Sequence, residues 1–367
     1  MKALLFNILL MAVMYPAIPN SGGTINPKTI SGKYTKEKKI SKSFEVSAND
    51  LLKIDNSYGN INVTTWNENR IEIDVVVKVN GNDEGKVKEK LNDINIKMSQ
   101  TAEGVFAKTY LEKENRSWWD VLFGDSNNLN MEISYTIKTP VNNNIHLIND
   151  YGNIYLDKLK GNAKIDCDYG SIDIGELLGE SNYINIDYSR NSHIGTVKNA
   201  VINADYSEFE VEDARFVDLN ADYSKSKFGK VEYLKFSCDY GSLTVDKVKK
   251  IEGNADYLNT RIGQVHHSLD LGVDYGNVEI EKVVKGARTI KIASDYAGVK
   301  IGYAQDQAFS FDVESSYGSV NGLEDFNIQK QSKESTQKNY SGYYMNSSNS
   351  ANINIKSSYA KITFQKK

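Results

Sequence analysis

The stretch IDCDYGSIDI, at residues 165–174, carries the pattern that decides the fold, and close versions of it recur along this chain of 367 residues. The tyrosine of this pattern recurs from copy to copy at a nearly constant spacing, which lengthens slightly at the end of the series. The repeated tyrosines are Tyr151, Tyr169, Tyr188, Tyr206, Tyr223, Tyr240, Tyr257, Tyr275, Tyr296 and Tyr317. A period near 18 over so many copies is typical of a solenoid, in which each repeat is one coil stacked on the next.

Each copy also has an inner pattern of apolar residues. They lie four and two positions before the tyrosine and three, five and often eight positions after it, as in Ile165, Cys167, Ile172, Ile174 and Leu177. Alternation with period two predicts two short strands per repeat, and the Gly or Ser that usually follows the tyrosine favours a corner between them. We therefore predict an all-β fold: a single-stranded, β-helix-like β-solenoid with coils of ~18 residues.

The same alternation predicts the direction of the repeated side chains. The tyrosine has the parity of the apolar positions before it, so its ring is expected inside, and the preceding aspartate outside. The position two before the tyrosine is mostly small, as in Ala204 and Ala221, which leaves room for a ring. We therefore predict that the ten tyrosines form a structural ladder of buried, stacked rings, worth about 0.5–1.5 kcal/mol per contact beyond area burial.

The outward aspartates, from Asp150 to Asp295, form a column of like charges that some interaction must offset. One interpretation is a turn in which each carboxylate accepts the backbone N–H two residues on, at the Gly or Ser of the corner. The alternative is a row of calcium ions between coils. Because each corner has a single aspartate, the turn is favoured, and no metal or other cofactor is predicted.

The chain divides into four predicted segments. Residues 1–20, in which Lys2 precedes an apolar run, are typical of an export signal. Residues 21–45 are expected to be a linker, and residues 46–139 a β-rich N-terminal cap with an early copy of the repeat at Tyr58 and a short helix at 83–91. Residues 140–367 hold the repeats, interrupted by an exposed polar loop at 329–350.

Composition excludes several classes of protein. The formal net charge of −4 argues against a nucleic-acid partner. The only cysteines, Cys167 and Cys238, are four coils apart, so they are expected to be buried free thiols that do not form a disulfide. The four histidines have no metal-ligand spacing. No transmembrane segment is predicted in the mature chain, and no catalytic residue is assigned.

Two segments contain exposed aromatic residues that could contact a partner. The first is an apolar loop with Trp118, Trp119 and Phe123, which could bind a sugar or a protein, or could instead plug the open end of the coil. The second is the polar loop, with Tyr343 and Tyr344. The partner itself, an envelope protein or a glycan, and the oligomeric state are not determined by these residues.

The sequence resembles a bacterial "putative adhesin" domain family of unknown function. The likeness is carried by SYGNINVTTW at residues 57–66, running into IEIDV at 71–75, and by IHLINDYGNI at 145–154 with the Tyr-Gly corners that follow. It covers roughly residues 45–365. The resemblance implies an exported β-solenoid of the cell envelope, located in the periplasm, at the outer surface or outside the cell, of a type common in Bacteroidetes-like bacteria. It carries no catalytic residues to this chain.

Three functions fit these observations. The first is a non-enzymatic, adhesin-like or scaffold protein that binds a partner along a flat β face. The second is an accessory protein of envelope stress or signalling. The third is a carbohydrate-active β-helix enzyme, which would use outward carboxylates in a groove. Because aspartate recurs at almost every corner, instead of clustering at one place, the pattern favours a structural role over an active site.

Overall fold

The computed structural model describes residues 32–111, 129–346 and 351–367, and it is an all-β structure in which 21 strands and one helix are found among these residues. The predicted export signal and the loop with Trp118, Trp119 and Phe123 lie outside the described residues. No helix in the described ranges is long and apolar enough to span a membrane.

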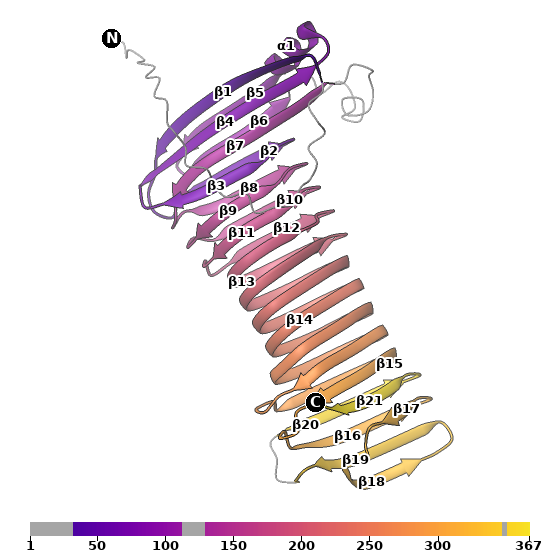
Figure 1. The fold of residues 1–367 in the computed structure, drawn as a ribbon. Helices are drawn as coiled ribbons and strands as arrows, with labels where there is room; N and C mark the ends of the chain where they lie inside the picture. The colour runs from indigo at the N-terminus through magenta and orange to yellow at the C-terminus, as the bar shows by residue number, and fades with distance from the viewer. Residues whose placement is uncertain (1–31, 112–128, 347–350) are drawn as a thin grey trace. The chain divides into compact units, whose positions relative to one another are not determined.

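The central part of the chain is a stack of parallel repeats (Figure 1). Its strands are β8 (Asn144–Asp150), β9 (Ile154–Leu159), β10 (Ala163–Asp168), β11 (Ile172–Leu177), β12 (Asn182–Asp187), β13 (Ser192–Asp205), β14 (Glu208–Val283) and β15 (Thr289–Tyr303). We call each repeat a rung: the extended segments just before and just after one repeated tyrosine, named by that tyrosine. Strand β10 pairs in parallel with β8 on one side and with β12 on the other, and Ile165 lies opposite Leu147 and Ile184. Neighbouring rungs are therefore neighbouring copies of the sequence pattern.

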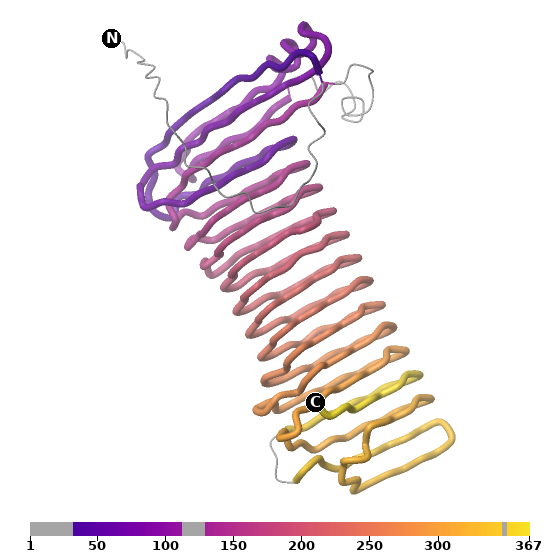
Figure 2. Tube along the Cα trace, viewed as in Figure 1, coloured from indigo at the N-terminus to yellow at the C-terminus, as the bar shows by residue number. Residues whose placement is uncertain are grey.

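The long segment β14 shows how the chain is folded. Its 76 residues would extend about 250 Å as a straight strand, at roughly 3.3 Å per residue. Four of the repeated tyrosines lie in it, and their ring centroids are 4.7 or 4.8 Å apart from one rung to the next. The segment therefore turns back on itself once per repeat, as the trace in Figure 2 shows.

The apolar positions of the pattern form the core, as predicted. In the Tyr169 rung, Ile165, Cys167, Ile172, Ile174 and Leu177 are all fully buried. Cys167 and Cys238 are buried free thiols, which confirms the expectation for the two cysteines. Burial raises the pKa of each thiol to about 12, so both stay protonated and pack as small apolar groups.

The N-terminal end contains β1 (Tyr34–Glu45), β2 (Leu51–Ser57), β3 (Ile61–Trp66), β4 (Arg70–Gly81), α1 (Glu84–Asp93), β5 (Ile94–Thr101), β6 (Gly104–Leu111) and β7 (Asn130–Pro140). The predicted helix is present, and the Asp83 side chain caps it by accepting the N–H of Lys86. The prediction of a linker at 21–45 is wrong for residues 34–45, because they form β1, which pairs antiparallel with β4. The Tyr58 rung, formed by β2 and β3, pairs directly with β8 and β9, although β4 to β7 lie between them in the sequence.

The C-terminal end contains β16 (Phe309–Ser316), β17 (Ser319–Asn321), β18 (Asn327–Lys333), β19 (Gln337–Tyr344), β20 (Asn352–Ser358) and β21 (Lys361–Lys366). The segment predicted as a polar loop instead includes the antiparallel hairpin β18–β19, of which β19 pairs with β16. Strand β18 is exposed on both faces, so its composition indicated exposure correctly but not the strand. Two lysines, Lys330 and Lys333, lie on this edge strand, where charge disfavours pairing with other chains.

Candidate functional site

The repeated tyrosines form one continuous column of stacked rings. Eleven contacts, with centroids 4.7–5.5 Å apart and planes within 12° of parallel, join twelve tyrosines among the described residues. In spatial order they are Tyr58, Tyr151, Tyr169, Tyr188, Tyr206, Tyr223, Tyr240, Tyr257, Tyr275, Tyr296, Tyr359 and Tyr317. We call this column the tyrosine ladder.

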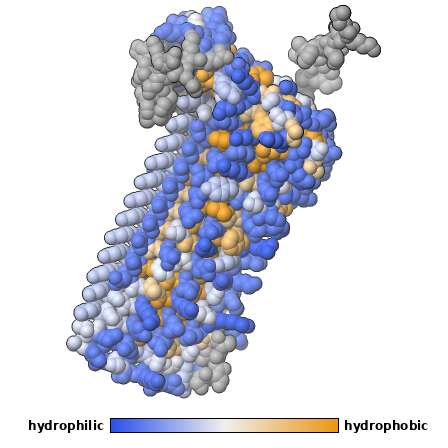
Figure 3. All heavy atoms as spheres, turned by 180° about the vertical axis from the view of Figure 1, so that it is seen from behind, coloured by the Kyte–Doolittle hydropathy of each residue, from blue (hydrophilic) through white to orange (hydrophobic). Residues whose placement is uncertain are grey.

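The ladder lies on the surface, which corrects the prediction of buried rings. Eleven of its side chains are 36–61% exposed, and Tyr58 is partly exposed. Figure 3 shows a regular row of pale, near-neutral side chains along one edge of the molecule, as expected for such a column. The rings cover one another's faces, so their edges and hydroxyl groups are what the ladder presents to solvent.

The backbone explains why the parity argument failed. All twelve ladder tyrosines have φ between 51 and 67°, the left-handed region that usually belongs to glycine. This conformation turns the side chain outward at the corner itself, and the next residue then faces inward, as buried Ser207 and Ser224 do. Each left-handed tyrosine costs about 1–2 kcal/mol, and ring stacking offsets part of that cost.

A chain of buried serines supports part of the ladder from inside. The backbone N–H of Ser189 donates to the Oγ of Ser207 at 3.0 Å, and that of Ser207 donates to the Oγ of Ser224 at 2.9 Å. The Ser224 hydroxyl donates to the main-chain oxygen atoms of Ala204 and Asp222. Because these bonds join three rungs, they fix the corners from which the rings project.

The aspartates next to the ladder interact between rungs. The backbone N–H of Asp222 donates to the carboxylate of Asp205 at 3.3 Å, and the same contact recurs from Asp239 to Asp222 and from Asp256 to Asp239. For these carboxylates the prediction of a bond from the residue two positions on is wrong, since the donor is the next aspartate in the column. Within the described ranges, no group of three or more His, Cys, Asp and Glu side chains is placed to hold a metal ion.

Burial and charge repulsion act together on Asp168 in this column. Burial, followed by the neighbouring carboxylates Asp187, Asp150 and Asp166, raises the pKa of Asp168 to about 6. One of its carboxylate oxygens is buried and has no hydrogen-bond partner in the described part of the chain. The ionised carboxylate is therefore less stable in the folded protein than in the unfolded chain, where its pKa is about 3.9.

We expect Asp168→Asn to stabilise the protein at pH 7.5 and to have little effect below pH 4. Because the folded-state pKa is raised, the stabilising contribution of Asp168 is complete below about pH 4 and is lost as the pH rises through about 6. The gain at pH 7.5 should be roughly 1 kcal/mol, since solvent screens this partly exposed group. Urea denaturation at pH 4, 5.5 and 7.5 measures the difference, and a less stable variant at pH 7.5 contradicts the argument.

The hydroxyls of Tyr151 and Tyr240 in the ladder remain neutral and able to donate hydrogen bonds at physiological pH. Burial, followed by neighbouring tyrosines and aspartates, raises the pKa of Tyr151 and Tyr240 above its ordinary value of 10.0. A phenol can both donate and accept. The ladder edge is therefore a regular row of hydroxyl groups beside a column of carboxylates.

We expect Tyr223→Ala to lower the free energy of unfolding by about 1–3 kcal/mol, the sum of two stacking contacts at 0.5–1.5 kcal/mol each. The side chain is 52% exposed, so its removal leaves no internal cavity and costs less than a buried ring would. Tyr155→Ala is the matched control, because Tyr155 is also exposed but lies outside the ladder. Chemical denaturation of both variants tests this; equal costs would show that stacking contributes nothing.

A shallow groove follows the strands that lead into the ladder. It has a volume of about 480 Å³ and is lined by small residues such as Gly272 and Ala293 together with Asp256, Asp274 and Asp295. The hollow arises where the outward position three before the tyrosine is Gly or Ala, because no long side chain covers the sheet there. The groove and the ladder therefore belong to the same rungs.

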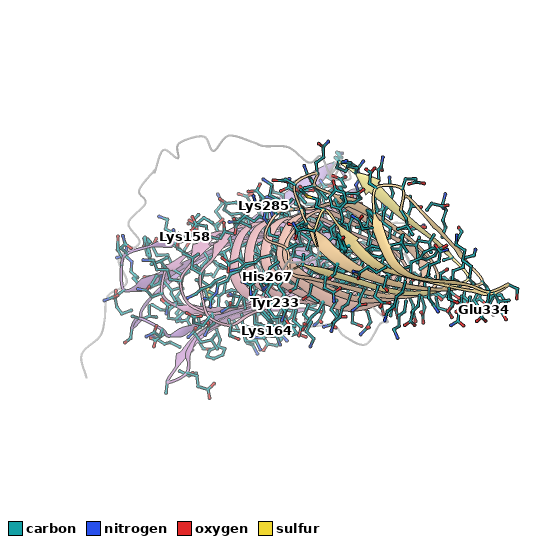
Figure 4. The ribbon with its side chains drawn as sticks, turned by 90° about the horizontal axis from the view of Figure 1, so that it is seen from below. Lys158, Lys164, Tyr233, His267, Lys285 and Glu334 are labelled. Carbon is teal, nitrogen blue, oxygen red and sulfur yellow. The ribbon has the colours of Figure 1, made fainter. Side chains whose placement is uncertain are left out.

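A second groove has a volume of about 380 Å³ and was not predicted. It lies on the part of each repeat that comes about ten residues after the ladder tyrosine. Its lining includes Phe216, Tyr233, Lys250 and His267, which occupy the same position of four successive repeats. The Phe216 and Tyr233 rings meet edge to face at 5.2 Å, and the Lys250 ammonium lies 4.4 Å from the Tyr233 ring centroid. In Figure 4, which looks along the stack from below, the labels of Tyr233 and His267 fall beside each other, as expected for the same position of repeats two apart. The signal in the sequence is that these four residues occupy equivalent positions of successive repeats, as the ladder tyrosines do.

The other predicted contact residues lie apart from the ladder. Tyr344 is only 6% exposed, packs against Phe309 with centroids 5.4 Å apart, and donates its hydroxyl hydrogen to the main-chain oxygen of Gln305. Tyr343 is partly exposed on β19. Tyr344 therefore belongs to the C-terminal core, and a direct partner contact through it would need that core to open.

Three solved structures are similar to this chain. One is a putative cell adhesion protein from Clostridium sporogenes, 12% identical, with 90% of this chain and 100% of that chain covered and a TM-score of 0.19. The others are putative adhesins from Bacteroides fragilis (10% identical, 89% and 97% covered, TM-score 0.26) and Parabacteroides distasonis (12% identical, 89% and 97% covered, TM-score 0.25). No family model and no curated protein matches the chain.

Proposed function

We propose that this chain is a non-enzymatic, exported β-solenoid of the cell envelope that binds an extended, neutral glycan along the tyrosine ladder. The observation that carries the proposal is the ladder itself: an uninterrupted row of exposed tyrosines whose ring centroids repeat every 4.7–5.5 Å over twelve rungs. A polymer of repeating sugars offers a matching row of hydroxyl groups. Many weak contacts of this kind add up to useful affinity when they act on one partner.

Electrostatics supports a neutral partner. The carboxylates of Asp205, Asp222 and Asp239 run beside the rings, so a polyanion approaching the ladder meets repulsion. The groove of about 480 Å³ supplies further carboxylate oxygens that can accept hydrogen bonds from sugar hydroxyls. The ring faces are occupied by stacking, so hydrogen bonds at the ring edges, instead of stacking on sugars, are the expected contacts.

The regularity of the rungs supports a binding function over catalysis. An active site is a local exception to a repeat, with a few unusual polar residues in neighbouring rungs. Here the tyrosine recurs in rung after rung with the same left-handed backbone conformation, in most rungs after an aspartate. A surface with so little local variation suits contact with a periodic partner.

The test is binding of the full-length mature protein to an array of neutral and charged glycans. The triple variant Tyr188→Phe, Tyr223→Phe, Tyr257→Phe removes three hydroxyls and keeps the stacked rings. At about 0.5–1.5 kcal/mol per lost hydrogen bond, we expect affinity to fall at least tenfold. The matched control is Tyr155→Phe with Tyr183→Phe, two exposed tyrosines outside the ladder, which should bind as the unaltered protein does. Unchanged binding by the triple variant, or binding to no neutral glycan, would overturn the proposal.

A further inference from the structure

The last rung in the sequence is not the last rung in the stack. Strand β20 pairs in parallel with β15 on one side, Thr289 opposite Asn352, and with β16 on the other, Ser310 opposite Asn352. The ring of Tyr359 correspondingly lies between Tyr296, at 4.7 Å, and Tyr317, at 4.9 Å. Residues 352–366 therefore fill a slot between two rungs that precede them in the chain.

The two walls of this slot are themselves successive copies of the repeat. Ser268, Thr289 and Ser310 occupy the same position of three successive copies, and Ser268 pairs directly with Thr289. Everywhere from the Tyr151 rung to the Tyr296 rung, such successive copies pair directly. The inserted rung thus interrupts a direct pairing of successive copies, and its register would be the same if another chain supplied it.

Side-chain contacts also distinguish the two sides of the slot. The hydroxyl groups of Ser294 and Ser357 are hydrogen-bonded at 2.9 Å. On the opposite side Ser315 is fully buried, and its hydroxyl has no partner among the described residues. The inserted rung is therefore matched well to the Tyr296 rung and less completely to the Tyr317 rung, which favours opening on that side.

The inserted rung cannot remain free in water once it leaves the slot. Ile353, Ile355, Ile362 and Phe364 are all buried in it, and withdrawal would expose them together. A place that offers the same pairing, ring stacking and apolar core is the equivalent slot of a second copy. Strand β19 ends at Tyr344 and β20 begins at Asn352, so few residues separate them in the sequence, and a short connection favours exchange between chains.

We propose that two copies of this chain exchange residues 352–366, so that the C-terminal rung of each fills the slot of the other. The exchanged dimer keeps the contacts that the described residues make in the slot, including the Ser294–Ser357 hydrogen bond. This proposal is independent of the glycan-binding function, because the slot and its contacts do not require a ligand.

Cysteine cross-linking tests the exchange in full-length protein. A Ser294→Cys chain and a Ser357→Cys chain of different tag length are mixed, incubated and oxidised with copper phenanthroline. We expect a covalent heterodimer of twice the apparent mass on a non-reducing gel, which disappears with reductant. A mixture of Ser207→Cys and Ser357→Cys chains is the matched control, since Ser207 is an equally buried serine outside the slot, and it should give no heterodimer.

The double variant Ser294→Cys/Ser357→Cys reports whether the pair can cross-link at all. Rungs lie about 4.8 Å apart, within the Cα separation that a disulfide spans, so this variant should form the bond within one chain or across an exchanged dimer. If it cross-links only within single chains and the mixed chains give no heterodimer, the proposal is overturned. If it does not cross-link in either way, the pairing on which the proposal depends is wrong.

Discussion

Phe228→Ala should lower the free energy of unfolding by about 3–5 kcal/mol, as truncation of a large core side chain does. Phe228 is fully buried, and its ring packs edge to face on that of Phe209 with centroids 6.0 Å apart. The backbone of a rung is fixed by hydrogen bonds to two neighbours, so the walls cannot collapse far into the space that the ring leaves. Denaturation with guanidinium chloride, followed by circular dichroism, measures the change.

The control for this variant is Phe216→Ala. Phe216 is the same residue type in a nearby part of the stack, but it is partly exposed in the second groove and packs edge to face on Tyr233. The loss of its ring should lower the free energy of unfolding by only about 1 kcal/mol or less, because no closed cavity forms. Equal costs for the two phenylalanines would mean that the interior of the stack is not close-packed.

Gly170→Val is expected to prevent stable folding or to cost more than about 4 kcal/mol. A Cβ atom on Gly170 would lie against the main-chain oxygen of Gly152 in the neighbouring rung, with the carbonyl carbon of Gly152 only 2.7 Å away. Both atoms belong to a hydrogen-bonded backbone that cannot move aside without breaking the stack. Soluble yield, circular dichroism and the denaturation midpoint together report the effect.

A glycine outside the stack provides the comparison. Gly85 lies in α1, where an added Cβ meets only the Asp83 side chain at 3.2 Å. Gly85→Ala should therefore change stability by no more than about 1 kcal/mol, in the stabilising direction if helix propensity decides. A Gly170→Val protein as stable as Gly85→Ala would show that the rungs are packed less closely than the structure has them.

The sequence alone determined the interior of the repeats. The apolar residues around Tyr169, from Ile165 to Leu177, predicted the strands and the core because alternation reports directly which face of a strand is buried. It also predicted one tyrosine column, two buried thiols and the helix after Asp83. Each of these depends on local pattern or on contacts between equivalent positions of adjacent repeats, which a constant period specifies.

Only the tertiary structure decided the direction of the tyrosines and the order of the end rungs. The apolar alternation changes parity at the corner but does not show that Tyr223 itself is the left-handed residue, so parity placed the ring on the wrong side and missed the exposed surface that is now the candidate site. The rung at Tyr359 lies between Tyr296 and Tyr317 because all three carry the same repeat, and sequence order cannot choose among equivalent partners. Long-range packing makes that choice, because the position of the Tyr359 rung must both be reachable from the rest of the chain and bury Ile353 and Phe364.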